Sequence, residues 1–169
     1  MIFHESLRGK DSLIVFFTGW GCDENCTSHL ISDNYDIITV YDYSDLSNVS
    51  VLTSTIHNYK KTHLIAWSFG VKTAQQILSN ELFTRKIAIN GTINLIDKNF
   101  GILPEIFART QNSLSEENLI RFYKNMTLEH FSFFDSHRPL RNYSSIKNEL
   151  SLLDKFPDKC DYSFYDEAF

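Results

Sequence analysis

Four short apolar runs in the first half of the chain constrain its fold most strongly. They occupy residues 13–17, 35–41, 62–67 and 85–90. The first, L-I-V-F-F, has no polar position and ends just before two glycines. An unbroken apolar run of this length suits a strand covered on both faces better than an amphipathic helix. We therefore expect four strands, with residues 13–17 as a central parallel strand.

The segments between these runs are long enough for helical crossovers. They occupy residues 24–33, 48–61 and 69–82. In the last segment Ala74, Ile77 and Leu78 recur at helical spacing. Because parallel strands need a crossover connection, alternating strands and helices predict an α/β fold, with a mostly parallel sheet and helices on both faces.

The second half of the chain has a different pattern. Residues 104–156 are helical in pattern throughout, with a clear helix start at residues 115–118 (S-E-E-N). We expect residues 100–156 to form a helical cap on a single domain that spans residues 1–169. A helical layer over one edge of the sheet is the alternative.

Composition excludes several classes of protein. With 169 residues, 43% of them apolar, the chain can fill one core, and a net charge of -5 gives no basic groove for nucleic acid. No apolar segment has the length of a membrane span, so we expect a cytoplasmic protein. The three cysteines cannot all pair and lack zinc-site spacing, so we expect no metal and reduced thiols at Cys22, Cys26 and Cys160.

The segment A-W-S-F-G at residues 66–70 carries the clearest chemical signal. It matches the G-x-S-x-G nucleophile elbow, except that Ala66 replaces the first glycine. A sharp turn from strand to helix would lift the hydroxyl of Ser68 above the sheet, next to a helix N-terminus that favours negative charge. A serine that only caps a helix behind a strand is the simpler alternative.

A second segment, T-G-W-G at residues 18–21, ends the first central strand. In an α/β-hydrolase this loop donates one backbone N–H to the oxyanion, and the residue after the serine donates the other. Trp20 and Phe69 are the predicted donors. An ordinary tight turn would also explain two glycines, but both segments in this order favour a hydrolase elbow with Ser68 as nucleophile.

The histidines do not complete a triad. In this fold the acid and the histidine follow the serine in the chain, and only His130 and His137 do so. Both lie in the helical segment, where we expect surface or packing roles.

Several motifs together match one known family. They are F-T-G-W-G at residues 17–21, V-Y-D-Y at 40–43, A-W-S-F-G at 66–70, I-N-G-T at 89–92 and L-S-E-E-N-L at 114–119, followed by Phe122 and Tyr123. The combination resembles the BioG family of α/β-hydrolases, which are pimeloyl-[acyl-carrier protein] methyl ester esterases of biotin synthesis. The likeness runs across nearly the whole chain.

This resemblance implies that Ser68 is the nucleophile and that Phe107, Phe122 and Tyr123 cover the acyl chain. The implied reaction hydrolyses the methyl ester of a pimeloyl chain and leaves its thioester to acyl carrier protein intact. No metal or organic cofactor is implied. We expect the acidic carrier protein to dock on basic residues near the cap, Arg138 and Arg141, although a solvated helix face is the simpler explanation of these residues.

One feature departs from the family. There, a strand such as the one that residues 161–169 begin leads to a catalytic Asp and then a His, whereas this sequence ends at Phe169. We therefore expect the C-terminal strands and helix to be missing and ester hydrolysis to be very weak. The alternatives are a non-catalytic remnant that binds acyl carrier protein or acyl chains, and a serine hydrolase for another ester.

Overall fold

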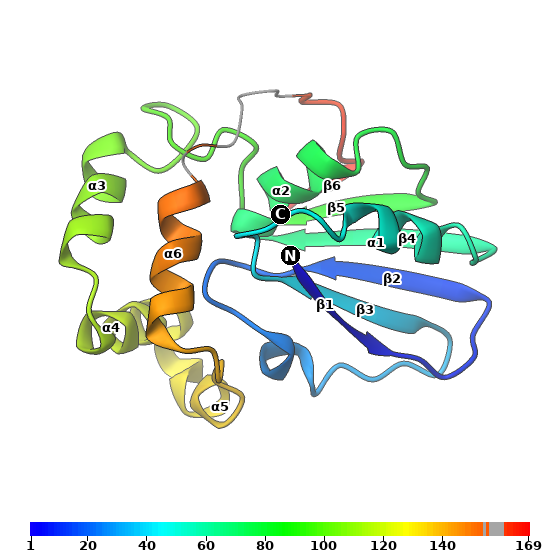
Figure 1. Ribbon diagram of the computed structural model, residues 1–169, viewed down its shortest axis with the longest axis horizontal. Helices are drawn as coiled ribbons and strands as arrows, with labels where there is room; N and C mark the ends of the chain where they lie inside the picture. The colour runs from blue at the N-terminus through cyan, green and yellow to red at the C-terminus, as the bar shows by residue number, and fades with distance from the viewer. Residues whose placement is uncertain (154, 156–160) are drawn as a thin grey trace.

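The computed structural model describes residues 1–153, 155 and 161–169 and contains one sheet with strand order β1-β3-β2-β4-β5-β6 (Figure 1). The predicted strands are β2 (Ser12–Phe17), β3 (Asp36–Tyr41), β4 (Lys61–Trp67) and β5 (Arg85–Ile89). Each pairs in parallel with its neighbours among the four. The predictions of a mostly parallel sheet and of a central first strand are confirmed.

Two further strands lie at the edges of the sheet. β1 (Ile2–Ser6) runs antiparallel to β3, and the short β6 (Glu167–Ala168) runs parallel to β5. β1 was not predicted because its residues are mostly exposed and include a histidine and a glutamate. Its pairing with β3, rather than an apolar run, makes this segment a strand.

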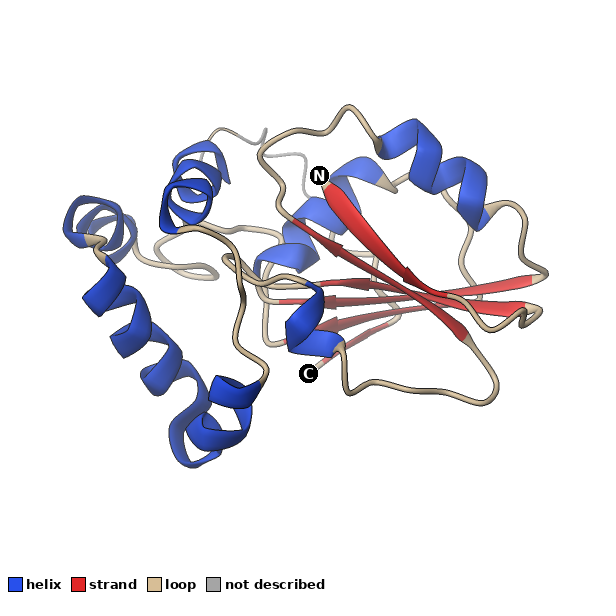
Figure 2. Ribbon diagram, turned by 60° about the horizontal axis from the view of Figure 1, so that its bottom comes forward, coloured by secondary structure: helices blue, strands red, loops and turns tan. Residues whose placement is uncertain are grey.

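The crossovers cover the two faces of the sheet unequally. α1 (Val49–Ile56) and α2 (Phe69–Ile77) lie on one face, and the short 3-10 helix η1 (Glu24–Thr27) lies on the other (Figure 2). Right-handed crossovers require this, because the chain moves along the sheet one way from β3 to β5 and the opposite way from β2 to β3.

The predicted helix over residues 24–33 is much shorter in the structure, where only residues 24–27 are helical, as η1. Polar side chains bind the local backbone here instead of continuing a helix. The hydroxyl of Thr27 donates to the carbonyl of Glu24 at 3.1 Å, and the hydroxyl of Ser28 donates to that of Asn25 at 2.9 Å.

Helices also fill the region predicted as a cap. They are α3 (Pro104–Ser113), α4 (Glu116–Thr127), the 3-10 helix η2 (Leu128–His130), α5 (Phe131–Ser136) and α6 (Tyr143–Leu153). We call α3, α4, α5 and α6 the cap helices; they lie beyond the carboxyl ends of the parallel strands (Figure 1). The predicted start of α4 is confirmed, since the Ser115 hydroxyl accepts the N–H of Asn118 at 3.1 Å. Residues 154 and 156 of the predicted cap, and Cys160, lie outside the described residues.

One hydrophobic core joins the sheet to the cap helices. Phe17 of β2, Tyr123 of α4 and Ile146 of α6 all belong to it, each with at most 2% of its surface exposed. Burial of this apolar surface fixes the cap helices against the carboxyl edge of the sheet. Among the described residues, no helix combines the length and the apolar character needed to cross a membrane.

Candidate active site

Ser68 stands in a strained turn between β4 and α2. Its φ is 54° and its ψ is -120°, a conformation that residues with a side chain rarely adopt. Hydrogen bonds hold the turn on both sides: the N–H of Ser68 donates to the carbonyl of Ile89 at 3.0 Å, and the N–H of Val71 donates to that of Ser68 at 3.1 Å. This is the backbone geometry of a nucleophile elbow.

Three glycines let two backbone segments approach the elbow closely. A Cβ at Gly70 would lie 2.6 Å from the carbonyl oxygens of Phe17 and Thr18, and one at Gly91 would lie 2.4 Å from that of Ser68. A Cβ at Gly19 would lie 3.3 Å from the Cβ of Ser68. The loop after β2 and the loop after β5 therefore both pack directly against the serine.

The side chains of the two predicted donor residues, Trp20 and Phe69, lie near each other. The rings of Trp20 and Phe69 have centroids 6.5 Å apart. Within the part of the chain that the structure describes, neither of their backbone N–H groups has a hydrogen-bond acceptor. Phe69 is also the first residue of α2, whose N-terminal dipole favours a developing anion.

Ser68 opens into a pocket of about 330 Å³. Besides the serine and Phe69, its walls come from the connection between β5 and α3, with Asn90, Gly91, Thr92, Leu95, Phe100, Gly101 and Ile102. Two of these side chains are polar and three are apolar, so the pocket can hold an ester group next to a short aliphatic chain. Residues 89–92 form the I-N-G-T motif, for which the sequence predicted no role in the site.

The predicted acyl-binding residues do not line this pocket. Phe107 and Tyr123 are buried in the core. Phe122 lines another hollow, of about 470 Å³, between α3 and α4, and its ring lies 5.2 Å from that of Trp20. Arg109 and Arg121 also line that hollow.

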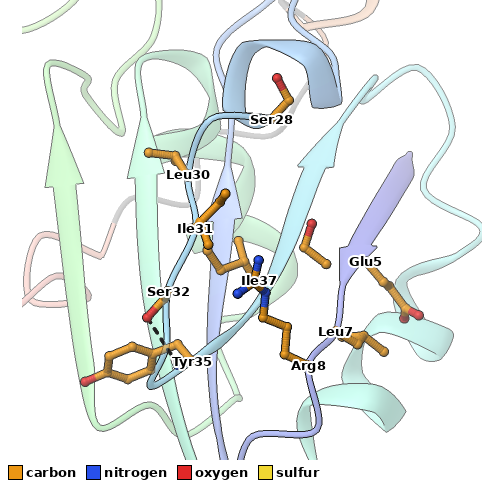
Figure 3. Close-up of a pocket in the computed structure, with 10 residues that line it drawn as sticks. Glu5, Leu7, Arg8, Ser28, Leu30, Ile31, Ser32, Tyr35 and Ile37 are labelled. Atoms are coloured by element: carbon orange, nitrogen blue, oxygen red, sulfur yellow. Dashed lines mark hydrogen bonds between the residues drawn. The ribbon is translucent and has the colours of Figure 1, made fainter.

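A third hollow, of about 340 Å³, lies near the amino-terminal end of β3 (Figure 3). Arg8, Tyr35 and Ile37 are among its lining residues. Ser68 follows the carboxyl end of β4, so this hollow belongs to the opposite edge of the sheet. It contains none of the predicted site residues.

All six histidines lie within the described residues, and none lines the Ser68 pocket. The side chain of His130 is 80% exposed. His137 packs against His29 and Phe133, with ring centroids 5.1 and 4.5 Å away. Both histidines therefore have the surface and packing positions that the sequence predicts.

The prediction that Arg141 belongs to a docking surface is wrong. Only 8% of its side chain is exposed, and its guanidinium pairs with Asp42 at 3.0 Å and with Glu149 at 2.7 Å. Burial raises the pKa of the Asp42 carboxyl, but hydrogen bonding by Ser44 and the charge of Arg141 outweigh it, so the pKa lies below its ordinary value. Arg138 is exposed and lies 3.4 Å from Asp135.

Two thiols follow the T-G-W-G segment closely in the sequence. Cys22 and Cys26 are both free, as expected. A hydrogen bond between them raises the pKa of Cys22 and lowers that of Cys26, although burial opposes the second change. Among the described residues, no cluster of histidine, cysteine and acidic side chains could hold a metal ion.

A strained serine between a buried strand and a helix, at the carboxyl edge of a mostly parallel sheet, defines the chain as an α/β-hydrolase. The family described as pimeloyl-ACP methyl esterase BioG matches residues 3–160. The chain belongs to this BioG family.

Several relatives are consistent with this assignment. A Bacteroides fragilis protein named malonyl-[acyl-carrier protein] O-methyltransferase is 40% identical over 145 residues, which cover 83% of this chain and 29% of that protein. An uncharacterized protein of Haemophilus influenzae is 32% identical over 149 residues, which cover 85% of this chain and 66% of that protein. The chain thus spans less than two thirds of either relative.

Solved structures give the same fold. The crystal structure of BioG from Haemophilus influenzae matches with a TM-score of 0.88 and 28% identity, covering 99% of this chain and 79% of that one. MenH from Staphylococcus aureus matches with a TM-score of 0.59 and 14% identity, covering 88% of this chain and 68% of that one. At this identity the likeness to MenH shows the fold alone.

Proposed function

We propose that the chain is a serine carboxylesterase that hydrolyses the methyl ester of pimeloyl-[acyl-carrier protein] methyl ester. The strained Ser68, open to a pocket with an aliphatic wall, carries this proposal. The family description supplies the substrate. The name of the Bacteroides fragilis relative also includes an acyl group on a carrier protein, which supports a substrate of this class.

In the proposed reaction, the hydroxyl oxygen of Ser68 attacks the carbonyl carbon of the methyl ester. The backbone N–H groups of Trp20 and Phe69 stabilise the negative charge on the tetrahedral oxygen. The bond to the methoxy group breaks, methanol leaves with a proton, and water then hydrolyses the acyl-serine to a free carboxylate. The aliphatic chain would lie against Leu95 and Ile102.

We place the carrier protein near the hollow between α3 and α4. Arg109 and Arg121 are exposed there, whereas Arg141 is buried. Positive charge at this position would attract an acidic carrier protein and orient its acyl group toward Trp20, which lines the same hollow. Arg138 remains a candidate at the edge of this surface.

The test of this function uses the pimeloyl methyl ester carried on acyl carrier protein. We expect release of methanol with an intact thioester, and we expect Ser68→Ala to abolish it. Mass spectrometry of the carrier-bound acyl group distinguishes loss of the methyl group from loss of the whole chain. Cleavage of the thioester, or equal rates with and without Ser68, would reject the proposal.

Charge reversal tests the docking surface separately. Arg109→Glu together with Arg121→Glu should raise KM for the carrier-bound ester, most strongly at low salt, and leave a small soluble methyl ester unaffected. Lys147→Glu, an exposed charge reversal on α6, is the control. A KM that rises equally for both variants would argue against a specific surface at the hollow.

A second candidate function is binding of acyl carrier protein or acyl chains without hydrolysis. The observation in its favour is that none of the six histidines lines the Ser68 pocket, whereas a serine hydroxyl needs a base to take its proton. Tight binding of the carrier-bound ester without any release of methanol would support this candidate.

A further inference from the structure

The predicted oxyanion loop, residues 18–22, is held by side chains and backbone groups from distant segments. The indole N–H of Trp20 donates to the carbonyl of Ile146 at 2.9 Å, and the hydroxyl of Tyr123 donates to the carbonyl of Gly21 at 3.3 Å. The hydroxyl of Tyr43 donates to the carbonyl of Thr18 at 2.7 Å. The cap helices α6 and α4 thus hold the Trp20 side chain and Gly21, and Tyr43, in the loop after β3, holds Thr18.

Glu149 of α6 makes the central contact. Its carboxylate is 0% exposed and accepts the backbone N–H of Gly21 at 3.1 Å and that of Tyr43 at 2.9 Å. One carboxylate therefore ties the loop after β2 to the loop after β3. An ionised carboxylate accepts hydrogen bonds at both oxygens, which these donors require.

Arg141 holds the Glu149 carboxylate in place. Its guanidinium contacts Glu149 at 2.7 Å and Asp42 at 3.0 Å, and it also donates to the carbonyl of Cys22 at 3.2 Å. Burial raises the pKa of Glu149, whereas Arg141 and the N–H groups of Tyr43 and Gly21 oppose this rise. A buried carboxylate is tolerated only with such partners, so the contacts define one geometry for the loop.

We propose that Glu149 is a positioning residue, which fixes the peptide that follows Trp20 so that the Trp20 backbone N–H points at the oxyanion of the Ser68 adduct. This inference rests on the proposed function. The Gly21 N–H and the Trp20 indole are both anchored to α6, by Glu149 and Ile146. An N–H held in advance stabilises the transition state without reorganisation, and this is the source of most oxyanion-hole catalysis.

Glu149→Gln tests the proposal, with Lys147→Gln, an exposed position of the same helix, as the matched control. Glutamine keeps the shape but has a single acceptor oxygen for the three donors around it. We expect kcat for ester hydrolysis to fall about 10- to 100-fold, somewhat less than when a donor is removed outright, with KM nearly unchanged. Affinity for an alkyl boronic acid should fall by a similar factor, because its adduct with Ser68 carries the negative oxygen.

Three outcomes would overturn the inference. If Glu149→Gln and Lys147→Gln have the same kcat and the same boronic acid affinity, Glu149 does not position the loop. If only the unfolding midpoint falls while kcat per folded molecule is unchanged, the role of Glu149 is purely structural. If the wild type shows no turnover that depends on Ser68, the proposed function fails, and this inference fails with it.

A second variant keeps the test informative should Glu149→Gln not fold. Arg141→Lys preserves the charge beside Glu149 but loses part of the guanidinium contacts. In Arg141→Lys, kcat and the affinity for the boronic acid should both fall by a similar factor, and this factor should be smaller than in Glu149→Gln. Unchanged values for both quantities in Arg141→Lys would again contradict the proposal.

Discussion

Gly70, two residues after Ser68, packs directly against the carboxyl end of β2. Its missing Cβ would meet two backbone carbonyl oxygens at 2.6 Å. Gly70→Ala should therefore lower the free energy of unfolding by about 1–3 kcal/mol and also displace the elbow, so that Ser68 reacts more slowly with a fluorophosphonate. Urea unfolding and labelling rates measure the two effects.

Gly9→Ala is the control for Gly70→Ala. Gly9 has a φ of +73°, so alanine is strained there, but no atom lies within 4 Å of the added Cβ. This variant should lose stability without losing Ser68 reactivity, since Gly9 is remote from the elbow. Equal reactivity in both variants would show that the Gly70 contact does not support the serine.

Two arginines that look alike in the sequence should differ strongly in their effect on stability. Arg141→Met breaks a buried network with Asp42 and Glu149, so we expect the free energy of unfolding to fall by about 3–5 kcal/mol. Arg138→Met removes a half-exposed pair and should cost less than about 1 kcal/mol. Chemical unfolding of both variants checks this, and similar losses would contradict the buried network.

Residue types alone predicted part of the site. Ser68, Trp20 and Phe69 lie in short motifs whose geometry follows from local backbone rules. The positions of Arg141 and Glu149 depend on pairing over long distances, since Glu149 binds the N–H of Gly21 across 128 positions of the sequence. One signal was present: Glu149 is a charged residue on the apolar face of α6, three positions after the buried Ile146.

Asp36, the first residue of β3, binds the loop before β2 and the segment between α1 and β4 at the amino-terminal end of the sheet. Its carboxylate accepts the N–H groups of Arg8 and Lys10 at 2.7 and 3.2 Å, and the hydroxyl of Tyr59 at 3.0 Å. Burial raises the pKa of Asp36, but these bonds outweigh it and the pKa lies below the ordinary value of 3.8. Burial and the bond to Asp36 raise the pKa of Tyr59 to about 12.

This arrangement predicts a pH dependence of stability. The stabilisation by Asp36 should be fully present above pH 3.8 and should be lost as the pH falls through the lower pKa of the folded state. Asp36→Asn should thus cost about 1–3 kcal/mol at neutral pH and progressively less below pH 3.8. The exposed Asp33→Asn is the control, and a loss for Asp36→Asn that stays constant down to low pH would contradict this account.

Most strands could be predicted from the sequence, whereas β1 and the short length of η1 could not, and the reasons are physical. β3 is buried at every position, and β2 and β4 alternate between buried and mostly half-buried positions, so these strands produce apolar runs that are visible in the sequence. β1 is an exposed edge strand that exists through its pairing with β3, and η1 is short because side chains compete for its backbone. Neither tertiary pairing nor this competition leaves a periodic pattern in the sequence.

At the scale of the whole molecule, the sheet and the cap helices both contribute to the structure of the candidate site. The sheet supplies the elbow and the loop predicted to bind the oxyanion, while α4 and α6 anchor that loop through Tyr123, Ile146 and Glu149. The pocket itself is formed by the connection that leads from β5 to α3. The sequence predicted the cap region as a cover for the acyl chain, and the structure adds its contacts with the oxyanion loop.

Selective reaction of Ser68 tests the central claim most directly. The protein is treated with a small fluorophosphonate when folded and when unfolded in urea, and the modified serines are mapped by peptide mass spectrometry in the wild type and in Ser68→Ala. We predict that the folded wild type is modified mainly at Ser68, and that unfolding or the substitution removes this selectivity. Modification spread over several serines in the folded protein, unchanged by Ser68→Ala, would contradict the assignment of Ser68 as the nucleophile.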